Sequence, residues 1–102
     1  MLKTANPRFK LIYEAFKPFI DEYGIRNIAV FGSYANGTEK AGSDIDIIVE
    51  MSKQFGLFKY IGLKQDIEKQ LGMAIDLVER QCLEPLLKDS ILASAVTIYE
   101  QR

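Results

Sequence analysis

An acidic pair set into an apolar run constrains this chain more than any other feature. Asp44 and Asp46 lie in an otherwise apolar stretch that continues to Val49 and predicts a β-strand. Because residues i and i+2 of a strand share one face, both carboxylates should point the same way, roughly 7 Å apart along the backbone. Two like charges on a half-buried face repel each other and are costly to desolvate, and a divalent cation between them removes much of that cost. Mg²⁺ prefers carboxylate and phosphate oxygens, so the pair indicates metal-assisted phosphoryl or nucleotidyl chemistry.

A third carboxylate, that of Asp76, falls inside the apolar segment from Met73 to Val78, which also predicts a strand. An unpaired carboxylate there is costly, so Asp76 needs an arginine, several hydrogen-bond donors or a metal ion. If its strand lies beside that of Asp44 and Asp46, the three carboxylates converge, and such a patch can hold two Mg²⁺ ions. One ion would carry a triphosphate and the other would lower the pKa of an acceptor hydroxyl, whose proton Asp76 could also accept. The alternative is an ordinary strand-end aspartate that faces solvent or an arginine.

A glycine-serine turn precedes the acidic pair at a fixed distance. Gly32 and Ser33 follow a short apolar run, and ten residues separate Ser33 from Asp44. Glycine allows a tight turn and a close approach of backbone amides to an anion, and the amides and hydroxyl of Ser33 can hold phosphate oxygens if a helix begins there. The turn fits neither the Walker A pattern nor the Rossmann fingerprint, so it is a weak signal by itself.

The remaining pattern predicts alternating helices and strands. Asn6 and Pro7 indicate a helix start, Pro18 should break that helix, and Gly24 should end it. We expect strands at 28–31, 44–51, 74–78 and 95–99 and helices at 57–71 and 85–93, with a turn-rich segment at 32–42. The fold class predicted is α/β (α+β): one domain, residues 1–102, with a small mixed β-sheet and helices packed against it.

Composition excludes several functional classes. The net charge of −1 offers no basic footprint, so direct nucleic-acid binding is not expected. The chain has no histidine, which removes zinc-hydrolase and Ser-His-Asp schemes, and Cys82 is its single cysteine, which removes an internal disulfide. We find no apolar run long enough to span a membrane and no secretory signal, so a cytoplasmic protein without membrane contact is expected.

Residues 31–50, Phe-Gly-Ser-Tyr-Ala-Asn-Gly-Thr-Glu-Lys-Ala-Gly-Ser-Asp-Ile-Asp-Ile-Ile-Val-Glu, resemble the signature of the minimal nucleotidyltransferases in the DNA polymerase β-like superfamily. The resemblance covers nearly the whole chain. It implies that Gly32 and Ser33 contact nucleotide phosphates, that Asp44 and Asp46 bind Mg²⁺, and that Asp76 is the third acidic residue of the metal site.

The resemblance also implies a partner. Such proteins are commonly antitoxins encoded beside a HEPN-domain toxin, so the implied reaction moves AMP from ATP to a toxin tyrosine and silences its ribonuclease. One position departs from the family: Asn36 stands where members often carry an arginine that helps to neutralise the triphosphate. Lys40, Lys53 and Arg80 are the candidates to replace that charge.

Three functions stay open on the sequence alone. The first is an Mg²⁺-dependent nucleotidyltransferase that modifies a partner protein, in a hetero-oligomer with it. The second is a binding module that keeps the fold and neutralises a toxin by occlusion, which the departure at Asn36 favours. The third is a transferase acting on a small molecule such as an aminoglycoside. Against the third, 102 residues leave no second domain to hold an acceptor, so we expect the acceptor itself or a partner protein to complete the site.

Overall fold

The computed structural model describes residues 7–32, 35, 37, 44–53 and 55–101, and it begins with a broken helical arm. Helix α1 spans Pro7–Phe16, a 3-10 turn follows at Lys17–Phe19, and α2 spans Ile20–Tyr23. The break coincides with Pro18, as predicted, because proline removes a backbone donor and clashes with the preceding turn. Gly24 ends the arm with φ +62°, a left-handed conformation that favours glycine.

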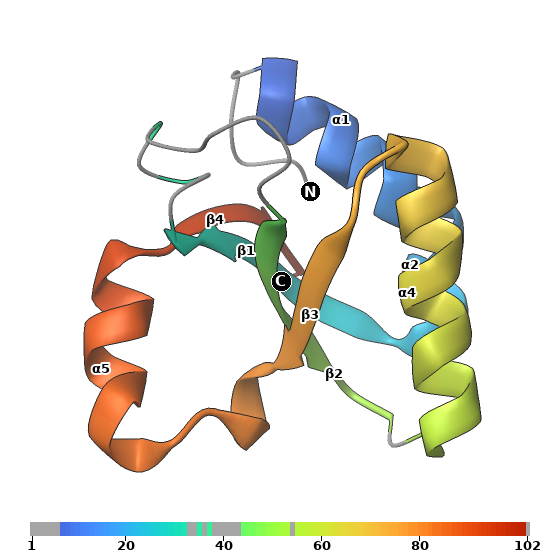
Figure 1. Ribbon diagram of the computed structural model, residues 1–102. Helices are drawn as coiled ribbons and strands as arrows, with labels where there is room; N and C mark the ends of the chain where they lie inside the picture. The colour runs from blue at the N-terminus through green and yellow to red at the C-terminus, as the bar shows by residue number, and fades with distance from the viewer. Residues whose placement is uncertain (1–6, 33–34, 36, 38–43, 54, 102) are drawn as a thin grey trace.

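A four-stranded mixed sheet forms the centre of the molecule (Figure 1). Its strands are β1 (Ile25–Phe31), β2 (Ile45–Met51), β3 (Ile75–Glu79) and β4 (Val96–Glu100), in the spatial order β3-β2-β1-β4. β1 is antiparallel to both β2 and β4, whereas β2 and β3 are parallel. This arrangement confirms the predicted α+β fold with a small mixed sheet.

Two further helices connect the strands. The long helix α4 (Leu57–Leu71) links β2 to β3 and ends at Gly72, while α5 (Pro85–Ser94) links β3 to β4 after a 3-10 turn at Arg80–Cys82. Each element lies within three residues of its predicted bounds at either end. The acidic pair is divided by the start of β2, because Asp44 precedes the strand and Asp46 lies inside it.

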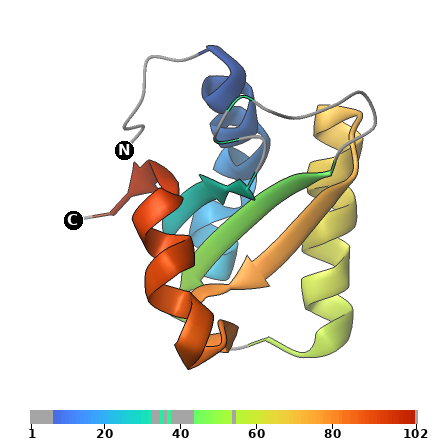
Figure 2. The same ribbon diagram turned by 60° about the vertical axis from the view of Figure 1, so that its left-hand side comes forward.

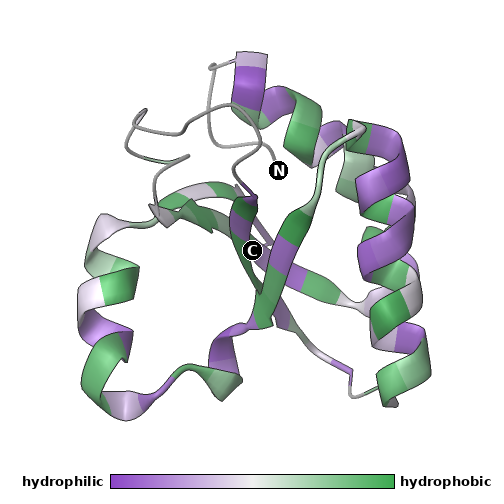
Figure 3. Ribbon diagram, in the orientation of Figure 1, coloured by the Kyte–Doolittle hydropathy of each residue, from purple (hydrophilic) through white to green (hydrophobic). Residues whose placement is uncertain are grey.

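The hydrophobic core lies between one face of the sheet and the helices α1, α2 and α4. Figures 1 and 2 show these helices on one side of the sheet, with α5 on the other. Figure 3 shows α4 as alternating hydrophobic and hydrophilic stretches, as expected for a helix with one face against a sheet. The buried core residues from these elements include Ile12, Phe16, Ile28, Val30, Ile45, Ile47, Leu63, Ile67, Ile75 and Leu77.

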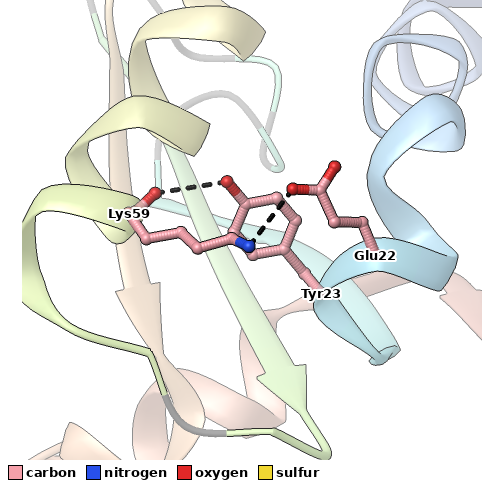
Figure 4. A network of polar contacts seen from close by, with 3 residues as sticks. All are labelled: Glu22, Tyr23 and Lys59. Atoms are coloured by element: carbon pink, nitrogen blue, oxygen red, sulfur yellow. Dashed lines mark hydrogen bonds and ion pairs between the residues drawn. The ribbon is translucent and has the colours of Figure 1, made fainter.

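A polar network fastens α2 to the first turn of α4 (Figure 4). The Tyr23 hydroxyl donates a hydrogen bond to the Lys59 carbonyl oxygen at 3.3 Å, and the Lys59 ammonium lies 3.3 Å from a carboxylate oxygen of Glu22. The same ammonium lies 5.3 Å from the centre of the Tyr23 ring. Both charged side chains are about half exposed, so this ion pair adds little stability.

No helix within the described part of the chain is both long and apolar enough to cross a bilayer.

A pair of identical substitutions on α4 tests the position of the core. Leu63 is fully buried whereas Leu57 is 70% exposed. Leu63→Ala should lower the free energy of unfolding by about 2–5 kcal/mol, because it leaves a cavity. Leu57→Ala should change it by no more than about 0.5 kcal/mol. Urea unfolding of both variants measures the difference, and equal losses would contradict the assignment of the buried face.

Candidate active site

The parallel pairing of β2 with β3 brings two of the three predicted carboxylates together. Asp46 and Asp76 are paired in register, and the Ile45 amide donates to the Ala74 carbonyl oxygen at 3.1 Å where the pairing begins. Neighbouring strands lie about 4.8 Å apart, and residues in register point to the same face. The strand of Asp76 therefore lies beside that of Asp46, which is the arrangement on which the predicted acidic patch depended.

The third carboxylate, that of Asp44, lies outside the strand pairing, and its charge acts on Asp46. Asp46 is half-buried, whereas Asp44 and Asp76 are exposed. The pKa of the Asp46 carboxyl is raised above its usual value, first by burial and then by the negative charges of Asp76 and Asp44. A raised carboxyl pKa means that the ionised form is disfavoured there. The patch is therefore poised to accept positive charge.

Gly32 makes room for this carboxylate. It follows β1 directly, with φ +71°, and Phe31 before it is paired in register with Asp46. A Cβ atom at Gly32 would lie 2.4 Å from Oδ2 of Asp46, closer than non-bonded atoms approach. The backbone conformation therefore favours glycine, and a larger residue would also push the Asp46 carboxylate aside. The sequence indicated Gly32 for its turn, but its contact with Asp46 depends on the pairing of β1 with β2, which no local pattern reveals.

Several predicted residues of the loop lie outside the described part of the chain. These are Ser33, the predicted phosphate ligand, together with Asn36 and Lys40. Their contribution stays a prediction.

Asp46 and Asp76 are the two paired carboxylates that could contribute to a cation site. Within the described residues, no group of three or more Asp, Glu, His or Cys side chains is arranged to hold a metal ion. Mg²⁺ is usually held by one or two carboxylates together with substrate phosphates and water. Asp46 and Asp76, adjacent and mutually repelling, therefore fit an ion that is shared with a nucleotide.

Two of the three candidate replacement cations lie at the wrong end of the sheet. Arg80 follows the last residue of β3, and its Nη1 lies 3.7 Å from Oε2 of Glu50, near the end of β2. The side chain of Lys53 lies against Gly24, which precedes β1. Asp46 and Asp76 lie at the opposite ends of β2 and β3. Neither cation is therefore placed to neutralise a triphosphate at the carboxylates.

Comparison with known proteins agrees with this geometry. The nucleotidyltransferase domain family matches residues 12–98. The protein adenylyltransferase MntA of Thermococcus cleftensis is 35% identical over 82 residues, which are 80% of this chain and 83% of that protein.

Two solved structures share the fold. A crystal structure of a toxin-antitoxin with AMP-PNP has a TM-score of 0.78 at 23% identity, over 92% of this chain and 74% of that one. A tri-AMPylated HEPN toxin in complex with its MNT antitoxin, from Shewanella oneidensis, has a TM-score of 0.67 at 19% identity, over 91% and 73%. At these identities, the two structures establish the fold alone. The family match and the MntA relative go further: this chain belongs to the nucleotidyltransferase domain family, as a nucleotidyltransferase of the minimal type.

Proposed function

We propose that this protein transfers AMP from ATP to a hydroxyl of a HEPN-domain toxin, a tyrosine, and thereby acts as its antitoxin. The observation that carries the proposal is the in-register pairing of Asp46 with Asp76, with the charge of Asp44 close enough to act on Asp46. The chain matches the nucleotidyltransferase domain family, and in this proposal the patch would receive a metal-bound triphosphate.

The relatives support the nucleotide and the partner. The Thermococcus cleftensis relative is named a protein adenylyltransferase. One structural neighbour holds AMP-PNP, an ATP analogue, and another is an MNT antitoxin bound to a HEPN toxin that carries AMP groups. These names describe those proteins, and the shared family and fold extend the hypothesis to this chain.

Each acidic residue receives a role in this proposal. Asp44 and Asp46, with Asp76, would hold Mg²⁺ ions, two in the full complex, and the amides of Gly32 and Ser33 would hold phosphate oxygens. Bound Mg²⁺ would supply neutralisation of the charge that develops on the phosphate oxygens.

The reaction balances without any further reactant. The acceptor hydroxyl oxygen forms a bond to the α-phosphorus of ATP while the bond from that phosphorus to the bridging oxygen breaks. Pyrophosphate leaves with the electron pair, and Asp76 would take the hydroxyl proton, since it is exposed beside Asp46. In this proposal the partner protein supplies the acceptor hydroxyl, and complex formation would position it against the α-phosphorus.

One observation favours neutralisation by occlusion as a second candidate. Arg80 and Lys53 lie away from the acidic patch, so neither replaces the arginine that is absent at Asn36. Weak triphosphate binding would leave a protein that binds its toxin without modifying it.

Metal dependence of nucleotide binding is the first test. We expect Mg²⁺ or Mn²⁺ to bind weakly to the free protein and more tightly with ATP, because the ion would share carboxylate and phosphate ligands. Isothermal titration calorimetry with and without Mg²⁺ measures this. Identical ATP affinity in the two conditions would contradict the metal role of Asp44 and Asp46.

Mutual repulsion of the carboxylates predicts a stability change in the metal-free protein. Because the folded-state pKa of Asp46 is raised, its ionised form destabilises the fold at neutral pH. Asp76→Asn removes one repelling charge and should leave the free energy of unfolding unchanged or raise it by up to about 1 kcal/mol at pH 7. The gain should vanish as the pH falls through the pKa of Asp46, where its carboxyl becomes neutral.

Thermal unfolding between pH 3 and 8 checks this, with Asp89→Asn on α5 as a matched exposed control. A clear loss of stability for Asp76→Asn alone at pH 7 would indicate a structural ion pair instead of a metal site.

Substitution of the acidic residues should affect AMP transfer without affecting partner binding. Asp44→Ala and Asp46→Ala should each abolish AMP transfer, because a methyl group cannot hold the ion that stabilises the transition state, while complex formation persists. Label transfer from α-labelled ATP and size-exclusion chromatography measure the two properties with the proposed HEPN-domain partner, and Asp89→Ala is the control.

Each remaining outcome identifies another function. A wild-type protein that forms the complex but never transfers label would favour occlusion. A wild-type protein that ignores the partner yet labels a small hydroxyl compound would favour a small-molecule transferase.

A further inference from the structure

Strand β3 forms an edge of the sheet, and Asp76 lies on it. The strand order β3-β2-β1-β4 leaves one side of β3 without a strand neighbour. Along a strand, successive residues direct their backbone groups to opposite edges. The Ala74 carbonyl oxygen accepts from β2, so the backbone groups of Asp76 also face β2, whereas those of Ile75 and Leu77 face outward. An outer edge of this kind normally presents unpaired N–H and C=O groups.

Two side chains of α4 pair with this outer edge. Oε2 of Glu68 accepts a hydrogen bond from the Ile75 amide at 2.9 Å. The Tyr60 hydroxyl donates a hydrogen bond to the Leu77 carbonyl oxygen. These two backbone groups belong to the residues directly before and after Asp76. The helix therefore supplies an acceptor and a donor in the places that a further strand would occupy.

The Tyr60 hydroxyl remains protonated and can therefore act as a hydrogen-bond donor over a wide pH range. Burial, followed by the charges of Glu79 and Asp76, raises the pKa of its hydroxyl to about 12. The hydroxyl therefore keeps its proton throughout the ordinary pH range. Its bond to the Leu77 carbonyl oxygen places this hydroxyl beside the residue that follows Asp76.

The contacts from α4 restrict the movement of the strand segment that carries the Asp76 carboxylate. Backbone bonds to β2 hold Asp76 on one side, and α4 holds its two neighbours on the other. A residue on an edge strand moves more freely when hydrogen bonds hold the strand from one side only. A displacement of a reacting group by about 1 Å can greatly lower the rate of catalysis.

We propose that Tyr60 and Glu68 are positioning residues, which hold the Asp76 carboxylate beside Asp46 by clamping the outer edge of β3 from α4. For its kinetic consequence, the inference rests on the proposed transfer of AMP. Its structural consequence stands without that activity.

The test removes each half of the clamp. Tyr60→Phe deletes only the hydroxyl, and Glu68→Leu deletes the acceptor, whereas Glu68→Gln keeps a carbonyl oxygen and should restore it. Tyr23→Phe is the matched control, since it deletes another hydroxyl that bonds a backbone carbonyl, between α2 and α4 and away from β3 (Figure 4). Gln65→Leu, at an exposed position of the same helix, is the control for Glu68→Leu.

The first readout is NMR on the protein without metal or nucleotide. We expect faster hydrogen exchange of the Ile75 amide in Glu68→Leu, by about tenfold or more. The side-chain carboxyl carbon signal of Asp76 should broaden or shift in Glu68→Leu and in Tyr60→Phe. It should stay unchanged in Glu68→Gln and both controls. An Asp76 signal unchanged in both clamp variants would overturn the proposal, whether or not the protein transfers AMP.

The second readout is the rate of AMP transfer. In Tyr60→Phe and Glu68→Leu, kcat should fall about tenfold or more with KM for ATP nearly unchanged, because the reacting group is displaced while phosphate binding is kept. An unchanged kcat, or an equal fall in Tyr23→Phe, would overturn the positioning role. A wild-type protein with no transfer contradicts the proposed function instead, and the NMR readout then decides the clamp by itself.

Discussion

The pairing of β2 with β3 is the contact on which the rest of the candidate site depends. A slip of one residue would send Asp76 to the opposite face, because side chains alternate along a strand. The register is held by the residues on either side of the carboxylates: Ile45 and Ile47 on β2, with Ile75 and Leu77 on β3, are all buried in the core. Hydrophobic burial on one face therefore sets the position of the acidic groups on the other.

Because the core lies on one face of the sheet and the carboxylates on the other, the protein can retain an acidic patch that lowers its stability. The raised pKa of Asp46 shows that its charge is disfavoured where it lies, and Asp76 and Asp44 add to the repulsion. The core on the opposite face supplies the compensating stability. Functional sites commonly hold groups whose pKa is shifted by such crowding, because a bound cation or substrate then relieves it.

Backbone constraints surround the acidic patch on both sides. On the side of β1, Gly32 leaves space for Oδ2 of Asp46, and any larger residue would displace it. On the side of α4, Tyr60 and Glu68 pair with the outer edge of β3. In the proposed site, Gly32 would thus leave Asp46 room, while the contacts from α4 would restrain Asp76 beside it.

The sequence by itself determined the elements and the chemical class. Local periodicity, the break at Pro18 and the glycine stops depend only on residues close together in the chain, and so does the Gly-Ser and Asp-x-Asp pattern that indicated a nucleotidyltransferase. The tertiary structure alone decided that Asp76 lies beside Asp46, and that Arg80 and Lys53 lie at the far ends of the strands. Local patterns do not encode strand order, since pairing between segments thirty residues apart is selected by the burial of the whole sheet.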